Sequence, residues 1–100
     1  MVEDNNPEYS IVIPCFKSGG WMDELVERTV SVMNSENVSY EIILVNDSSM
    51  DGETWPAILR NSRRFNEVRG IDLMSNVGQF RTTLAGFQHC RGSLIITLDD

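Results

Sequence analysis

The sequence is short of cysteine, of positive charge and of long apolar runs. Its 2 cysteines, Cys15 and Cys90, form no CxxC pair, which excludes a dense disulfide framework and favours reduced thiols in the cytosol. Only 8 basic residues accompany 15 acidic ones, and a chain with a net charge of -7 repels a nucleic-acid backbone. No apolar run approaches the roughly 20 residues of a membrane span, and from the polar start we expect no signal peptide. We therefore expect a cytoplasmic chain that does not bind nucleic acid.

Two common nucleotide-binding motifs are missing as well. Neither a GxGxxG fingerprint nor a P-loop occurs, which argues against the dinucleotide-binding and P-loop classes. What is present is the composition of a soluble globular chain, with 41% hydrophobic and 23% charged residues. A length of 100 residues suits one domain or one piece of a larger domain.

Short apolar runs alternate with segments of helical periodicity along the whole chain. Runs at residues 10–13, 40–45, 68–73 and 94–98 predict strands, and Pro14 should end the first of them. Helical spacing predicts helices over 21–33 and 53–62, and a third that Gly92 closes. Phe80, Leu84 and Phe87 are the expected inner stripe of that third helix. This β-α-β-α-β-α-β order predicts an α/β fold, a parallel sheet with helices on both faces.

Polar residues gather just after the predicted strands, where ligands bind in parallel sheets. The segments concerned are 14–17, 46–49, 76–79 and 99–100. Asp47 could accept hydrogen bonds from a nucleobase or a ribose, or it could cap the turn that follows it. Asp51 is expected to cap the second helix.

Asp99 and Asp100 are adjacent carboxylates at the end of the last predicted strand. Such a pair repels itself unless a cation or hydrogen-bond donors offset the charge. Mg²⁺ or Mn²⁺ prefers oxygen ligands and commonly links one or two carboxylates to a diphosphate, whereas the alternative is a solvated loop start. Because the chain stops directly after this strand, we expect it to be a fragment of a longer protein.

Together these segments resemble the motifs of the family 2 glycosyltransferases. Residues 10–16 (SIVIPCF) resemble the opening strand of the family, and 41–52 (EIILVNDSSMDG) resemble its second motif, usually V-D-D-G-S-x-D-G. Residues 76–79 (NVGQ) with 85–87 and 91–92 resemble the stretch that leads into the D-x-D strand, which 95–100 (IITLDD) matches. The combination looks most like the branch that transfers sugars to polyprenyl phosphates, including dolichyl-phosphate mannosyltransferase-like enzymes. Departures from the pattern are Lys17-Ser18 after the first strand, and Asn46 and Ser48 in the second motif.

The resemblance implies a three-layer α/β/α sandwich with strand order 3-2-1-4, the Rossmann-like nucleotide-binding half of a glycosyltransferase A fold. Residues 1–9 would be a flexible arm, and 10–100 the nucleotide-sugar-binding part, truncated at the D-x-D motif. It further implies a nucleoside-diphosphate sugar donor, Mg²⁺ or Mn²⁺, and inversion of the anomeric centre. The implied nucleotide-binding residues are Pro14, Cys15, Phe16, Asp47, Ser49, Asn76, Gly78 and Asp99. The implied metal ligands are Asp99 and Asp100, and no catalytic residue is expected in this piece.

The same resemblance suggests the setting of the parent protein. The acceptor would be a polyprenyl phosphate, in the synthesis of cell-wall or surface polysaccharide, and only other parts of the protein would meet the membrane, on its cytoplasmic face. The fragment alone should be inactive, and its edge strand, Leu94–Leu98, should pair with a second copy in a dimer. The alternatives are a nucleotidyltransferase and a non-catalytic α/β interaction domain.

Overall fold

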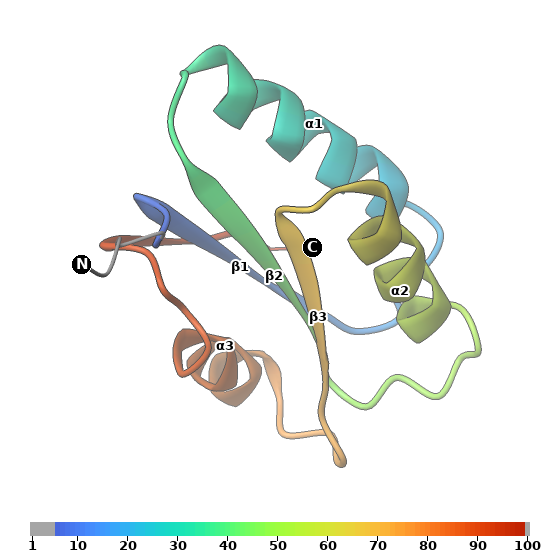
Figure 1. Ribbon diagram of the computed structural model, residues 1–100. Helices are drawn as coiled ribbons and strands as arrows, with labels where there is room; N and C mark the ends of the chain where they lie inside the picture. The colour runs from blue at the N-terminus through green and yellow to red at the C-terminus, as the bar shows by residue number, and fades with distance from the viewer. Residues whose placement is uncertain (1–5, 100) are drawn as a thin grey trace.

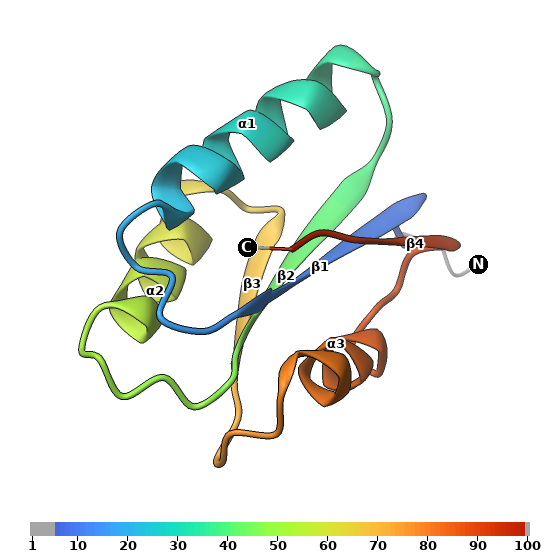
Figure 2. The same cartoon turned by 180° about the vertical axis from the view of Figure 1, so that it is seen from behind.

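The computed structural model describes residues 6–99 as one parallel sheet with three helices (Figure 1). The elements in chain order are β1 (Tyr9–Cys15), α1 (Met22–Ser35), β2 (Tyr40–Asn46), α2 (Thr54–Arg64), β3 (Val68–Asp72), α3 (Gln79–Phe87) and β4 (Leu94–Thr97). The sheet order is β3-β2-β1-β4, and every pair of neighbouring strands is parallel. Helices α1 and α2 cover one face of the sheet and α3 covers the other (Figures 1 and 2). The predicted three-layer arrangement is confirmed. No helix among residues 6–99 is long and apolar enough to cross a membrane.

The face under α1 and α2 holds the main core. Alternate residues of β1 and β2 point to this face, as the pleat requires, and meet the apolar stripe of α1 and the inner side of α2. The buried members of this core are Ile11, Ile13, Cys15, Met22, Val26, Val30, Met33, Tyr40, Ile42, Leu44, Ala57, Ile58 and Val68.

The face under α3 has a much smaller core. Its buried apolar residues are Val12, Ile43 and Val45. α3 buries Thr82 and Gly86 against this face, and a Cβ at Gly86 would lie 2.5 Å from a methyl carbon of Val12. The helix therefore sits too close to the sheet for a larger side chain at that position.

This close approach overturns the predicted inner stripe of the third helix. Phe80, Leu84 and Phe87 are 76%, 41% and 37% exposed, so they lie on the outer side of α3. The periodic pattern was real, but the tightly packed side of the helix is the one with the small residues. Gly92 is also not the cap that the sequence suggested, because α3 ends at Phe87 with Gln88 as its C-cap.

Pro14 does not end the first strand, because β1 continues to Cys15. The carbonyl of Val12 accepts the amide of Leu98, so the backbone groups of Val12 point toward β4. Those of Pro14, two residues further on, point the same way. The last pair with β4 is Val12–Thr97, so the ladder has already ended where Pro14 would have had to donate. At the other end, Tyr9 belongs to β1, and the amide of Glu8 donates to Ser39 Oγ at 2.9 Å. Residues 8 and 9 of the predicted arm are therefore part of the fold.

β4 lies at the edge of the sheet and pairs only with β1. Leu94, Ile95 and Ile96 are 58%, 44% and 37% exposed, and no residue of the strand is buried. The strand ends at Thr97, one residue short of the predicted Leu98.

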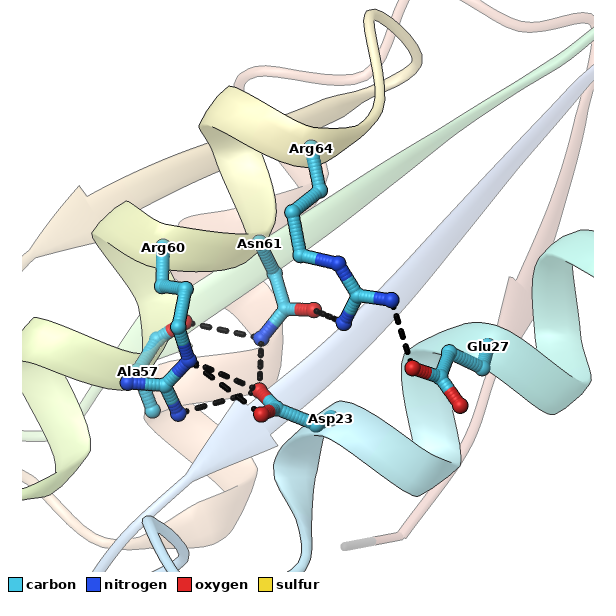
Figure 3. Close-up of polar contacts among 6 residues, drawn as sticks. All are labelled: Asp23, Glu27, Ala57, Arg60, Asn61 and Arg64. Atoms are coloured by element: carbon cyan, nitrogen blue, oxygen red, sulfur yellow. Dashed lines mark hydrogen bonds and ion pairs between the residues drawn. The ribbon is translucent and has the colours of Figure 1, made fainter.

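A polar network joins α1 to α2 (Figure 3). Asp23 accepts hydrogen bonds from Arg60 and from the buried Asn61, and Arg64 pairs with Glu27. The hydrogen bond from Arg60 holds the pKa of Asp23 below its ordinary value, and the bond from Asn61 adds to this while partial burial opposes it. The network links the two helices, which pack mainly through the core beneath them.

Candidate functional site

The loops that follow β1, β2 and β3 meet at the carboxyl edge of the sheet, and Asp47 joins them. Its amide donates to the carbonyl of Cys15 at 2.9 Å. Its two carboxylate oxygens accept the amides of Val77 at 2.7 Å and Gly78 at 3.0 Å, and Asn76 Nδ2 donates to its carbonyl at 3.0 Å. Asp47 is 4% exposed. A carboxylate just after β2 thus holds the loop in front of α3, about thirty residues further along the chain.

Asp47 is not the cap of its own turn, because Asn46 performs that role. Asn46 Oδ1 accepts the amide of Ser49 at 3.0 Å, and its Nδ2 donates to Asp72 Oδ1 at 2.8 Å. An aspartate at position 46 could not donate to the carboxylate of Asp72. Asn46 stands where the family usually has an acid, and its amide is the group that can donate to Asp72 on β3.

The loop after β1 is tied to the loop after β2. Ser49 Oγ accepts the amide of Lys17 at 2.7 Å, and the amide of Ser18 donates to Thr54 Oγ1 at 3.0 Å. Asp51 in turn accepts the amide of Thr54 at 3.0 Å and its hydroxyl at 2.9 Å. The Thr54 amide bond is the main reason why the pKa of Asp51 lies below its ordinary value. The N-cap residue of α2 is Glu53 rather than the predicted Asp51, but Asp51 Oδ1 does accept the amides of Glu53 and Thr54 at the start of the helix.

A cavity of about 260 Å³ opens between these loops and the start of α3. This is close to the lower end of small-molecule sites, roughly 300 Å³. It is lined by Pro14, Cys15, Phe16, Asp47, Asn76, Gly78, Gln79 and Thr82.

The structure brings six of the predicted nucleotide-binding residues to this cavity and leaves two outside it. Ser49 borders a neighbouring hollow beside β3, and Asp99 borders one beside β4. Gln79 and Thr82 were missed. Thr82 Oγ1 donates to the carbonyl of Gly78 at 2.8 Å, and its spacing of four residues from that glycine was the available signal.

Gln79 connects the cavity to the end of β4. The hollow beside β4 measures about 380 Å³ and includes both Gln79 and Asp99 in its lining. Gln79 Nε2 donates to Asp99 Oδ1, so the carboxylate lies next to the first residue of α3. Gly78, just before the helix, has a φ of +87°, a conformation that glycine adopts without strain. Asp100 lies outside the described residues.

The described residues provide only part of a metal site. Within residues 6–99, no three histidine, cysteine or acidic side chains are close enough to hold a metal ion. Asp47 is buried with a backbone amide on each oxygen, whereas Asp99 is exposed and accepts the side-chain amide of Gln79 at Oδ1, so Asp99 is the more accessible carboxylate. Mg²⁺ and Mn²⁺ commonly bind one or two carboxylates together with phosphate oxygens. Asp99 fits that role, in which the ligand supplies further oxygens.

A parallel α/β sheet with a cavity beyond the carboxyl ends of its strands is an open α/β fold with the cavity where such folds bind their ligands. Residues 10–100 match the family model described as Glycosyl transferase family 2. The chain therefore belongs to the family 2 glycosyltransferases, and the predicted family is confirmed.

Two curated relatives are undecaprenyl-phosphate 4-deoxy-4-formamido-L-arabinose transferases. The one from Shewanella sediminis is 39% identical over 100 residues, which is 99% of this chain and 30% of the relative. The one from Edwardsiella ictaluri is 39% identical over 92 residues, 90% of this chain and 28% of the relative. The chain thus spans about three tenths of the length of these relatives.

A solved structure gives the same fold. It is a mannosyltransferase from Pyrobaculum calidifontis in complex with GDP-Man and Mn²⁺, which superposes with a TM-score of 0.72. The match covers 94% of this chain and 27% of that chain at 16% sequence identity. This likeness confirms the predicted fold class, part of a glycosyltransferase A fold with a parallel sheet in the order 3-2-1-4.

Proposed function

We propose that residues 10–100 bind the nucleotide of a nucleoside-diphosphate sugar, as the donor-binding part of an inverting, metal-dependent glycosyltransferase. The observation that carries the proposal is the junction at Gln79, which borders the cavity and bonds to the carboxylate of Asp99. A nucleotide has an apolar base and an anionic diphosphate. The cavity suits the first, and the start of α3 beside Asp99 suits the second.

The residues around the cavity divide into two roles in this proposal. Pro14, Cys15 and Phe16 offer apolar surface and backbone groups to the base and ribose. Asp47 and Asn76 shape the pocket, and the remaining lone pairs of the Asp47 carboxylate can accept a base N–H. Ser49 has an indirect role, because its hydroxyl oxygen accepts the amide of Lys17 and so holds the loop after β1.

The diphosphate is proposed to lie between α3 and Asp99. Backbone amides at a helix N-terminus favour an anion, which offsets part of the repulsion expected from an acidic chain. A divalent cation bound by Asp99, by Asp100 and by phosphate oxygens would stabilise the negative charge that develops on the departing diphosphate. A carboxylate close to the diphosphate is unfavourable without such a cation.

The acceptor and setting are carried over from the relatives whose names specify undecaprenyl phosphate. We propose a polyprenyl phosphate acceptor for the parent protein, in the synthesis of surface polysaccharide at the cytoplasmic face of a membrane. Parts outside residues 1–100 would make the membrane contact and supply the acceptor site. The 100-residue chain alone should therefore bind nucleotide without transferring sugar.

Calorimetric titration of the chain with GDP and with UDP, each with and without Mn²⁺, tests the proposal. Binding is expected for one of the two diphosphates, and Mn²⁺ should tighten it. Asp99→Asn should reduce the gain from Mn²⁺ and raise the metal-free affinity, because it removes a negative charge beside the diphosphate. Tight binding of a nucleoside triphosphate but no diphosphate would favour a nucleotidyltransferase, and no nucleotide binding would favour an interaction domain. Sugar transfer by the purified chain would contradict its proposed inactivity.

The exposed edge strand supports a second, separate proposal, a dimer through β4. Its apolar residues and unpaired backbone groups are the features that promote pairing between chains. Sedimentation should detect a dimer that Ile95→Lys converts to monomer. A monomeric wild-type chain at high concentration would contradict this proposal and leave the nucleotide site untouched.

A further inference from the structure

A single acidic residue, Glu41, is buried in the middle of the sheet. It is 2% exposed and lies on β2. Strand side chains alternate between faces, and Ile42 belongs to the core under α1 and α2, so Glu41 points to the α3 face. A buried carboxylate is unfavourable unless hydrogen bonds and opposite charges compensate it.

The carboxylate of Glu41 is compensated by groups of β1, of β3 and of the connection between α3 and β4. Ser10 Oγ donates to Oε2 at 2.6 Å, and Arg69 Nη2 donates to Oε1 at 2.9 Å. Arg91 contributes its amide at 2.7 Å to Oε2 and its Nε at 3.2 Å to Oε1. Burial alone would raise the pKa of Glu41, but the bonds from Ser10, the Arg91 amide and Arg69 outweigh it, so the pKa lies below its ordinary value.

Two partners of Glu41 also hold the backbone on either side of Arg91. Ser10 Oγ accepts the amide of Gly92 at 2.7 Å, and Arg69 Nη2 donates to the carbonyl of His89 at 2.6 Å. A Cβ at Gly92 would lie 2.6 Å from the backbone nitrogen of Ser10, so this connection rests directly on β1. Residues 89–92 are thus fixed two residues before β4 begins.

β4 needs such an anchor because burial does not fix its position. A strand with one buried face resists slipping, since a shift of one residue exposes its apolar set, but β4 has no buried residue. A slip of two residues would preserve the pleat and move Asp99 by about 6.6 Å along the sheet. That displacement would carry its carboxylate away from Gln79.

We propose that Glu41 is a positioning residue that sets the register of β4 and thereby places Asp99 beside the nucleotide cavity. The inference rests on the proposed function for the role of Asp99, but its structural part concerns the sheet alone. Glu41 does not line the cavity, and it acts through residues 89–92.

The test compares Glu41→Gln with Asp23→Asn in the 100-residue chain. Each variant removes one negative charge that is bonded to arginine, but Asp23 lies in the network between α1 and α2, on the other face (Figure 3). The first measurement is the hydrogen-exchange rate of the Leu98 amide, which donates to the carbonyl of Val12 in β1. This rate is divided by that of the Asp47 amide, which donates to the carbonyl of Cys15. The second is the gain in GDP or UDP affinity on adding Mn²⁺.

Glu41→Gln should speed exchange at Leu98 at least about tenfold relative to Asp47, the effect of losing a hydrogen bond to a charged group. It should also remove most of the gain from Mn²⁺ while metal-free affinity is kept or raised, because the Asp99 carboxylate is then further from the diphosphate. Asp23→Asn should change neither the exchange ratio nor the gain in affinity from Mn²⁺. General loss of stability would instead accelerate both amides alike and weaken binding with and without metal, which would contradict the proposal.

Two further outcomes remain decisive. If Glu41→Gln does not fold, Ser10→Ala removes the hydroxyl between Glu41 and Gly92 and keeps the charge, and it should show the same two effects in weaker form. If the wild-type chain binds no nucleotide, the proposed function fails, yet the exchange ratio still decides whether Glu41 sets the register of β4. An unchanged ratio in both variants would overturn the inference.

Discussion

The two faces of the sheet are built in different ways. Under α1 and α2, buried apolar side chains form one continuous core that includes two helices and three strands. Under α3, the buried apolar residues among 6–99 are Val12, Ile43 and Val45, and on the same face lies the buried carboxylate of Glu41. The first face contributes apolar burial, which stabilises the fold strongly but is non-directional and so does not fix the position of single groups. The second supplies hydrogen bonds and a close helix contact, which add less stability but fix positions.

The candidate site depends on the second face. α3 carries Gln79, its preceding loop is held by Asp47, and β4 with Asp99 follows the connection that Glu41 holds. A change on the α1/α2 face should therefore lower stability with little effect on the geometry of the cavity. A change on the α3 face should alter binding at a smaller cost in stability. The predictions below test this division.

The largest effect is expected from a pair of neighbouring substitutions in β2. Ile42 and Ile43 are both 0% exposed and point to opposite faces. Ile42→Ala should lower the free energy of unfolding by about 4 kcal/mol. Ile43→Ala should lower it by about 2 kcal/mol, because the smaller core under α3 can close around the lost atoms. Urea denaturation measures both. Equal losses would show that the two faces contribute alike.

The next effect concerns the close contact of α3. Gly86→Ala would place a methyl group 2.5 Å from Val12 and 3.2 Å from Val45, and should cost about 1–3 kcal/mol. It should also weaken nucleotide binding, because the helix that carries Gln79 must move outward. Gly20→Ala is the matched control, since a Cβ there has no neighbour within 4 Å. Equal stability and affinity in the two variants would contradict the tight packing of α3.

A third prediction concerns the amide of Asn46. Asn46→Asp removes the bond to Asp72 and sets two carboxylates together, which should cost about 1–2 kcal/mol at neutral pH. Adding Asp72→Asn should restore most of the loss, because the donor and the acceptor are then exchanged. A double-mutant cycle from thermal or urea unfolding measures the coupling. Additive losses would show that the contact does not matter.

The smallest effect is expected from the exposed network between α1 and α2. The pKa of Asp23 is lowered in the folded state, chiefly by Arg60, so its contribution is present above the unfolded value near 3.9 and is lost as the pH falls below it. Asp23→Asn should therefore cost under about 1 kcal/mol at pH 7 and progressively less as the pH falls below the unfolded value. Glu41→Gln should show the same sign with a larger amplitude, since that carboxylate is buried. Urea unfolding from pH 3 to 7 compares the two, and a larger effect at acid pH would contradict both.

Much of the fold was predictable because it depends on local patterns. Apolar runs and helical periodicity located all seven elements, and their alternation implied a parallel sheet with polar loops at one edge. The inner face of α3 was not predictable, because it depends on how closely the helix approaches Val12 rather than on its own periodicity. The strand position of Pro14 likewise depends on where β4 ends. Both are tertiary effects.

The candidate site was predictable as a set of positions but not as a set of contacts. Composition pointed to the strand ends, and Asp47 and Asn76 do lie together there. That the oxygens of Asp47 would accept the amides of Val77 and Gly78 could not be read from residues thirty positions apart. Glu41 did carry a signal that was overlooked, since it is the one charged residue in β2.

The bond between Asn46 and Asp72 also bears on how sequences of this family can diverge. The two positions are neighbours on adjacent strands and share one donor and one acceptor. A lineage can place the acid on either strand, but a single replacement passes through a state with two acids or two amides. Relatives with the more usual aspartate at position 46 are thus expected to carry a donor such as asparagine at position 72, so that the two sites covary.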